Sequence, residues 1–251
     1  MPEAESRLRA DAHGAGLETE GVKFVLAGYD ESAVEQALLL RQELPGSSVH
    51  VLAVGPSTRV DEVLRAALAL GCDRATAVEA PVPPLADPTA TARALAGAIR
   101  PLGRFDLVLF GKQAGDDEEG IVGAAAAQAL DLPFVGHVVD LRPASDGQRL
   151  RFRRSVERGE ESWEAPLPLA VGLQQAWNDP RTATLPAILR SRKAPLGRQP
   201  AVDPAGTARS VGTGFALPPP RQGARMIEFS SPEEAARQLV RLLREEAKVF
   251  P

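Results

Sequence analysis

The 251-residue sequence contains a single cysteine, Cys72, and this scarcity excludes several classes of protein. One cysteine cannot form a disulfide framework or supply a multi-cysteine zinc or iron–sulfur site. No apolar run approaches the ~20 residues needed to span a bilayer. The first 20 residues also lack the basic-then-apolar order of a signal peptide. We therefore expect a soluble, cytoplasmic protein without stable membrane insertion.

An excess of positive charge is missing as well. The sequence contains 29 lysines and arginines and 33 aspartates and glutamates, which gives a formal net charge of −4. This balance excludes the strongly basic signature of a general nucleic-acid binder. The three histidines are scattered without ligand-like spacing, and neither Gly-x-Ser-x-Gly nor His-Glu-x-x-His occurs. The sequence predicts no catalytic constellation and no metal site.

Short apolar runs alternate with helical patterns from about residue 22 to residue 141. Val49–Gly55 is β-rich, and Asp106–Gly111 is typical of a strand that is buried on both faces of a parallel sheet. Ser57–Gly71 and Thr89–Arg100 have the spacing of amphipathic helices. This repetition predicts a three-layer α/β domain with a mostly parallel sheet and right-handed crossovers.

After Leu130 the sequence pattern predicts strands without long helices between them. His137–Leu141, Arg149–Ser155 and Leu167–Leu173 are separated by turn signals. They predict a mixed or antiparallel extension on one edge of the sheet.

The last part of the sequence is dense in proline and glycine over residues 195–225, which favours an extended arm. A helix follows, for which Ser231 supplies an N-cap, Pro232 the first position and Glu234 the third. We therefore divide the chain into an α/β domain over residues 1–194 and an arm with a C-terminal helix over residues 195–251.

One loop, Gly111–Gly123, lies directly between a predicted buried strand and a predicted helix. The amides of Gly120, Ile121 and Val122 open that helix, and free N–H groups at a helix N-terminus form a phosphate site. The loop is neither a Walker A motif nor GxGxxG, since Gln113 stands where Walker A has Ser or Thr. Its four carboxylates would repel a bare phosphate, so an acidic loop without a ligand remains an equal interpretation.

A second feature is the segment Trp177–Pro195. Its Asn-Asp-Pro turn precedes a short helix that Thr184 is placed to cap, with Leu185, Ile188 and Leu189 on one face. Basic residues crowd its last turn. Two interpretations remain. The segment is either a capped surface helix whose charges are only solvated, or a docking site for a partner, in which one exposed leucine is surrounded by basic residues (a basic rim).

These residues together resemble the electron-transfer flavoprotein β subunit across nearly the whole chain. The run Asn178–Pro186, Asn-Asp-Pro-Arg-Thr-Ala-Thr-Leu-Pro, is highly specific, and the Gly-Lys-Gln-Ala loop from Gly111 adds weight. The Ala66–Asp73 stretch and the Glu157–Glu161 segment ahead of Leu167-Pro168 also match.

The resemblance implies an adenine nucleotide α-hydrolase-like (Rossmann-like) fold and a heterodimer with an α subunit that holds most of the FAD. It implies an electron carrier rather than an enzyme, which accepts electrons from flavin dehydrogenases such as those of fatty acid oxidation. The β subunit itself would bind AMP, or a second FAD in electron-bifurcating members. By resemblance, the nucleotide contacts fall on Ala27, Gly28, Tyr29, Asp30, Val54, Gly111, Lys112, Gln113, Ala114, Gly115, Asp116, Asp117, Glu118, Glu119, Gly120, Ile121 and Val122. The recognition loop for dehydrogenases falls on Arg181, Thr182, Ala183, Thr184, Leu185, Pro186, Ala187, Ile188, Leu189 and Arg190, with Leu185 as the docking leucine.

The sequence departs from the family pattern at several points. Gly120-Ile121-Val122 replaces Asn-Gln-Thr, Ala27-Gly28 replaces Asn-Pro, and Arg158 interrupts an acidic or glycine run. Each missing side-chain hydrogen bond costs about 0.5–1.5 kcal/mol of nucleotide affinity. A subunit that still pairs but has lost its nucleotide is therefore an alternative.

The largest departure is at the start, where Pro2–Arg9 matches the segment that follows the family's first strand. Four or five buried apolar residues, at roughly 1.5–3 kcal/mol each, equal a typical domain's whole stability. We therefore expect the natural protein to begin about ten residues earlier, with an apolar strand that carries a basic residue near its end.

A rival hypothesis is a stand-alone adenine-nucleotide sensor or enzyme on the same fold. A pyrophosphatase-like ligase needs a Ser-Gly-Gly-x-Asp-Ser loop, which is absent from the sequence. A sensor would not need the segment Arg181–Arg190 or the proline-rich arm.

Overall fold

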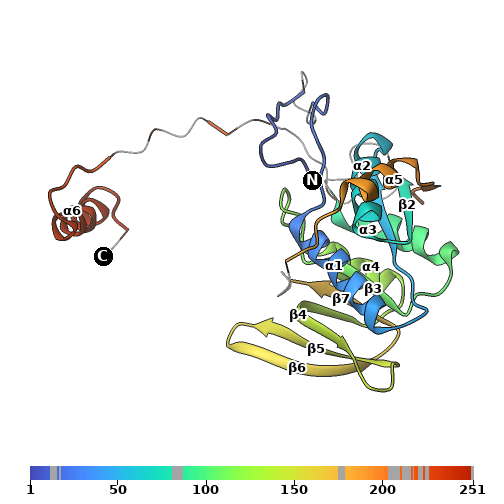
Figure 1. Cartoon of the computed structure of the whole chain (residues 1–251). Coiled ribbons are helices and arrows are strands. Elements are labelled where there is room, and N and C mark those ends of the chain that lie inside the picture. Colours follow the sequence, from blue (N-terminus) through green and yellow to red (C-terminus); the bar gives the residue numbers. More distant parts are fainter. Residues whose placement is uncertain are drawn as a thin grey trace. The chain divides into compact units, whose positions relative to one another are not determined.

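The computed structural model describes residues 1–11, 16, 18–80, 87–174, 179–202, 210, 216, 218–219, 223 and 226–249. The chain divides into two compact units, residues 1–216 and residues 217–251. The first unit is an α/β domain in which helices flank two sheets (Figure 1). This confirms the predicted fold class.

The first sheet is entirely parallel and has the order β1-β2-β8. Its strands are β1 (His50–Gly55), β2 (Arg74–Glu79) and β8 (Gly197–Pro200). Strand β8 lies where the sequence predicted an irregular arm, because four residues beside β2 need only backbone hydrogen bonds to form a strand. The first unit therefore extends beyond residue 194, and much of the remaining predicted arm lies outside the described residues.

The second sheet has the order β3-β7-β4-β5-β6. Its strands are β3 (Leu107–Gly111), β7 (Leu169–Leu173), β4 (Phe134–Pro143), β5 (Arg149–Val156) and β6 (Gly159–Pro166). The first three pair in parallel and the last three antiparallel. The predicted extension is therefore β4-β5-β6, whereas Leu167–Leu173 supplies an interior parallel strand instead.

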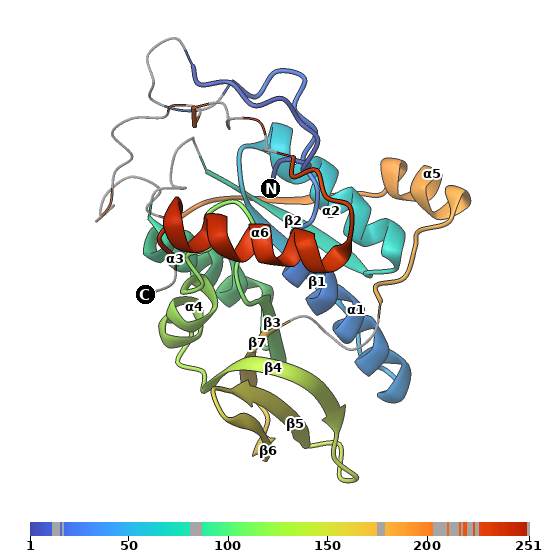
Figure 2. The same ribbon diagram turned by 90° about the vertical axis from the view of Figure 1, so that its left-hand side faces the viewer.

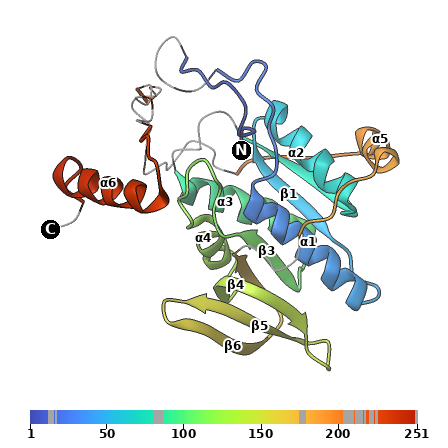
Figure 3. The same ribbon diagram turned by 60° about the vertical axis from the view of Figure 1, so that its left-hand side comes forward.

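Helices cover both faces of this arrangement (Figures 2 and 3). Helices α1 (Gly28–Glu43) and α2 (Ser57–Leu70) share a core cluster on one face, which includes Leu38. Helices α3 (Pro88–Ile99) and α4 (Val122–Ala129) pack on each other, and α3 covers the opposite side of β1 and β2. A short 3₁₀ turn (Arg100–Leu102) follows α3.

Helix α3 shows how the sequence sets this packing. Asp87 caps it by accepting hydrogen bonds from the backbone N–H groups of Thr89 (2.9 Å) and Ala90 (3.3 Å). Its buried positions are nearly all alanine, so the helix can approach the sheet and α4 closely.

The second unit contains α6 (Pro232–Glu245). The Ser231 hydroxyl accepts a hydrogen bond from the Glu234 backbone N–H at 3.3 Å, which confirms the predicted N-cap. The Glu234 carboxylate instead accepts from the backbone N–H of Ser230 at 3.2 Å and from its hydroxyl. The reciprocal half of the predicted capping box is therefore shifted by one residue.

The predicted buried strand Asp106–Gly111 is less buried than expected. Every residue of β3 is half-buried, whereas every residue of the neighbouring β7 is fully buried. The reason is that β3 ends its sheet, as β1 ends the other, so each has one side without a paired strand among the described residues.

Candidate functional site

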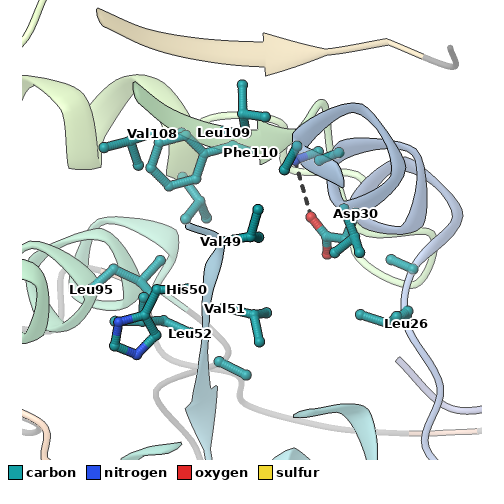
Figure 4. A pocket seen from close by; sticks show the side chains of 18 of the residues that line it. Leu26, Asp30, Val49, His50, Val51, Leu52, Leu95, Val108, Leu109 and Phe110 are labelled. Carbon is teal, nitrogen blue, oxygen red and sulfur yellow. Dashed lines mark hydrogen bonds between the residues drawn. The ribbon is translucent and has the colours of Figure 1, made fainter. Parts of the chain in front are cut away.

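A cavity of about 1480 Å³ lies between β1 and β3, and residues that follow the carboxyl ends of both strands line one end of it. Ligands of open α/β sheets bind at the carboxyl ends of the strands. Figure 4 shows the cavity, with Val51 and Leu52 of β1 across from Leu109 and Phe110 of β3.

The start of α1 approaches the end of β3 directly. The Asp30 carboxylate accepts a hydrogen bond from the backbone N–H of Gly111 at 3.0 Å (Figure 4). A Cβ atom at residue 111 would lie 2.5 Å from Asp30 Oδ1 and 2.8 Å from the carbonyl carbon of Tyr29. Glycine is therefore required at this contact, which brings the segment before α1 beside the loop after β3.

The loop between β3 and α4 offers backbone donors to an anion. Gly120 has a left-handed φ of 66°, and Ile121 follows in the right-handed region as the N-cap of α4. Alternation of left- and right-handed residues directs successive N–H groups into one concavity. No side chain caps α4, so its first N–H groups remain available as phosphate donors.

Carboxylates at the same place limit what the site accepts. The pKa of Asp30 lies above its usual value, mainly because the carboxyl is buried. The Gly111 N–H and the Met1 ammonium lower this pKa, and the charges of Asp116 and Asp117 raise it. Asp116, Asp117 and Glu119 also line the cavity. The backbone N–H groups of Gly120–Val122 therefore suit a phosphate, whereas the carboxylates suit the hydroxyls of a ribose.

Most of the predicted nucleotide-binding residues meet at this cavity. Those that line it are Ala27, Asp30, Val54, Gly111, Lys112, Gln113, Ala114, Asp116, Asp117, Glu119, Gly120 and Val122. Those that do not are Gly28, Tyr29, Gly115, Glu118 and Ile121. The Lys112 ammonium lies 6.0 Å from the centre of the Tyr29 ring, so Tyr29 still contacts a lining residue.

The predicted docking segment forms a helix, α5 (Leu185–Lys193), with apolar side chains in solvent. Leu185 is 68% exposed and Leu189 is 51% exposed. Exposed arginines 190 and 192 lie in the last turn of the helix. Thr184 is the N-cap residue, but its side chain makes no capping hydrogen bond, contrary to our expectation. Residues 175–178 of the preceding turn lie outside the described residues.

A residue that the sequence did not single out fixes the start of this segment. Glu35 of α1 is buried, and its carboxylate accepts from Arg181 Nε (2.7 Å), Nη2 (2.9 Å) and backbone N–H (3.1 Å). Burial raises the pKa of Glu35, but these hydrogen bonds outweigh it, so the pKa lies below its usual value.

The other end of α5 is tethered as well. Arg65 of α2 donates to the backbone carbonyl of Ser191 at 2.6 Å and to that of Ala194 at 3.3 Å. The helix that exposes Leu185 is thus held at both ends. Neither Glu35 nor Arg65 carries a local sequence signal for this role, because each partner lies more than 120 residues away.

Two residues with reactive side chains have structural roles. Cys72 is buried in the core between α1 and α2, and burial raises the pKa of its thiol to about 11. His50 Nε2 lies 2.8 Å from the Thr76 hydroxyl, and burial lowers the pKa of the ring. His13 lies outside the described residues.

Comparison with known proteins agrees with this arrangement. Residues 15–204 match the model of the electron transfer flavoprotein domain. The chain belongs to the electron transfer flavoprotein β-subunit family.

Three relatives illustrate the match. The caffeyl-CoA reductase-Etf complex subunit CarD of Acetobacterium woodii is 31% identical over 96% of this chain and 94% of its own length. The electron transfer flavoprotein subunit beta of Bacillus subtilis is 31% identical over 93% of this chain and 91% of its own. The electron transfer flavoprotein subunit beta of Homo sapiens is 35% identical over 74% of this chain and 72% of its own length. Within the described part of the chain, no helix is long and apolar enough to cross a membrane.

Proposed function

We propose that this β-family chain forms a heterodimer with a flavin-holding α subunit and accepts electrons from flavin dehydrogenases. The bound FAD, held mainly by the α subunit, supplies the electron-carrying chemistry. The chain's own contribution is to complete the FAD site, to bind an adenine nucleotide and to present a docking surface to the electron donor. Such a carrier needs no acid–base group of its own.

The exposure of Leu185 on a tethered helix is the observation that carries the docking role. A leucine that is 68% exposed is costly to leave in water, and a single buried anchor commonly dominates a transient interface. The basic last turn of α5 adds electrostatic steering, which raises the rate of encounter with an acidic partner surface.

The name of one relative supports a proposal for the class of electron donor. One relative is named as a subunit of a caffeyl-CoA reductase complex, so enzymes that act on acyl-CoA thioesters are the proposed partner class. The proposed docking surface consists of Leu185 and the basic last turn of α5, which contains Arg190, Arg192 and Lys193. None of these residues lines the cavity.

The cavity at the carboxyl ends of β1 and β3 is the proposed adenylate site. Backbone N–H groups at Gly120–Val122 are its phosphate donors, and the nearby carboxylates suit ribose hydroxyls. The bound nucleotide is AMP or the adenylate half of a second FAD. Both present the same adenylate group to this site.

Co-expression with an electron-transfer flavoprotein α subunit from the same genome tests this function. We expect a yellow one-to-one complex that releases FAD and an adenine nucleotide, identified by mass spectrometry. A colourless homodimer that binds nucleotide would contradict the proposal and support a stand-alone sensor. A yellow complex without nucleotide in the β site would retain the carrier role and exclude the adenylate role.

A further inference from the structure

Helix α1 contacts both of the regions to which the proposed function assigns a role. Near its start, Asp30 accepts a hydrogen bond from the Gly111 N–H at the nucleotide cavity (Figure 4). Five residues later, Glu35 accepts hydrogen bonds from the backbone N–H and the guanidinium of Arg181, at the start of the docking segment. At a rise of 1.5 Å per residue, the two contacts lie about 7.5 Å apart along the helix axis. The cavity and the docking segment are therefore joined by less than two turns of helix.

The phosphate donors pack beside the residue that Asp30 binds. A Cβ atom placed on Gly120 would lie 3.7 Å from the carbonyl oxygen of Lys112. Gly120, whose N–H group suits a phosphate, thus lies against the residue that directly follows Gly111 in the chain. A phosphate bound at this point would fix the loop, and with it the Gly111 N–H that donates to Asp30.

The start of α1 depends on this loop for its order. No side chain caps the helix, and its first residue is Gly28, a residue type with low helix propensity. The first turn is therefore stabilised by tertiary contacts, which include the hydrogen bond between Gly111 and Asp30. The later part of α1 is anchored independently, because the buried Gln36 side chain donates to the Leu141 carbonyl at 2.9 Å. A ligand that fixes Gly111 therefore stabilises the first turn in particular.

The first turn in turn supports Glu35. In an α-helix each N–H donates to the carbonyl four residues earlier, so residue 35 is bonded to residue 31 of the first turn. Helix formation is cooperative, so a frayed first turn leaves Glu35 at a new helix end. The bidentate contact between Glu35 and Arg181 depends on the direction of the carboxylate, which a helix end no longer fixes. Order in the first turn is thus transmitted to Arg181 and to Leu185, four residues after it.

We propose that an adenine nucleotide bound in the cavity orders the docking segment through α1, so that the nucleotide-loaded chain binds its electron donor more tightly. This inference rests on the proposed function, to which it adds that the bound nucleotide regulates docking. Because coupling between two binding sites is reciprocal, the bound donor raises the affinity for the nucleotide by the same factor. Such coupling is typically 5- to 150-fold, and we expect about 5-fold here.

Hydrogen exchange of the heterodimer, stripped of nucleotide and then saturated with AMP, tests the connection without any electron donor. The Gly111 and Arg181 amides report the two contacts of α1, because each donates to a carboxylate of this helix. We expect AMP to slow the exchange of both amides by about 5-fold or more. Slower exchange at Gly111 alone would overturn the inference and leave the adenylate site in place. Failure of AMP to bind would overturn both the inference and the adenylate part of the proposed function.

A substitution separates the connection from the two sites that it joins. Glu35→Ala removes the contact to Arg181 at a residue that does not line the cavity. In this variant AMP should still slow the Gly111 amide but should leave the exchange of the Arg181 amide unchanged. Glu31→Ala, in the same helix, is the control and should keep both responses. If the Arg181 amide of Glu35→Ala still slows with AMP, the coupling does not pass through α1 and the inference is wrong.

The affinity of the heterodimer for its dehydrogenase gives the functional readout. We expect this affinity to be about 5-fold higher with AMP bound, and the affinity for AMP to rise by the same factor when the dehydrogenase is saturating. Glu35→Ala should abolish both changes, whereas a merely structural role of Glu35 would lower the affinity and leave its dependence on AMP. Equal dehydrogenase affinity with and without AMP would overturn the inference but not the docking role of Leu185. No dehydrogenase binding in either state would overturn the docking role and the inference together.

Discussion

The Glu35 carboxylate binds the Arg181 guanidinium through two atoms, Nε at 2.7 Å and Nη2 at 2.9 Å, and so ties α1 to the start of the docking segment. The Glu35 side chain is 7% exposed and the Arg181 side chain is 30% exposed. Bidentate geometry fixes direction as well as distance. The position of Leu185, four residues after Arg181, thus depends on a residue of α1 that lies 146 residues before Arg181.

Replacing Glu35 with alanine should loosen this segment. Arg181 would lose its partner but could reach water, so we expect a loss of about 2 kcal/mol in the free energy of unfolding, below the cost for a fully buried pair. Dehydrogenase affinity should fall while FAD content stays the same. Denaturant titration and binding kinetics measure both, with Glu31→Ala in the same helix as the control. Unchanged affinity would show that the pair does not position the docking helix.

The same pair predicts a dependence of stability on pH. The pKa of Glu35 is lower in the folded protein than its usual value of 4.5. Its contribution is therefore present above pH 4.5 and is lost as the pH falls through the lower, folded-state pKa. Unfolding midpoints measured from pH 7 to pH 3 should fall less steeply for Glu35→Gln than for the wild type. Parallel curves would contradict a stabilising role for the ionised carboxylate.

Two glycines near the cavity give a matched pair of substitutions. Gly111→Ala places a Cβ 2.5 Å from Asp30 Oδ1 and 2.7 Å from its backbone nitrogen, so we expect a loss of about 1–3 kcal/mol in stability and weaker nucleotide binding. Gly28→Ala meets no heavy atom within 4 Å and should change stability by less than about 0.5 kcal/mol. Thermal unfolding and nucleotide titration of both variants measure these effects. Equal effects would mean that the close contact at Gly111 is unimportant.

Cys72 should resist modification. Because burial raises the pKa of its thiol to about 11, its thiolate fraction at pH 8 is about 100-fold below that of an exposed cysteine. Labelling with a disulfide reagent should be slow in the native protein and fast in denaturant. Rapid native labelling would indicate that the core between α1 and α2 opens readily.

The sequence predicted those elements whose local pattern and tertiary setting agree. The helices α2, α3, α5 and α6 and the strands β1 and β5 lie within a residue or two of their expected positions. Strand β6 was missed because its outward residues are charged. Arg151 and Arg153 pair across it with Glu164 and Glu160 at 3.0 and 2.6 Å, so charge replaces apolar alternation.

Long-range relationships could not be predicted in the same way. The position of β7 between β3 and β4 follows from sheet topology, which no local pattern encodes. For the site, the loop Gly111–Val122 and the exposed Leu185 were predicted from sequence. Their supports, Asp30 with Gly111, Glu35 with Arg181 and Arg65 with Ser191, came only from the structure.

The binding of a dehydrogenase by the Leu185→Ala heterodimer tests the docking account most directly. Stopped-flow measurement of electron acceptance should be compared with that of Val202→Ala, another exposed apolar residue, which is 60% exposed and lies outside α5. We predict about 30-fold weaker binding and slower electron acceptance for Leu185→Ala, with FAD content unchanged, and no change for Val202→Ala. Wild-type transfer rates and affinity in Leu185→Ala would contradict the account.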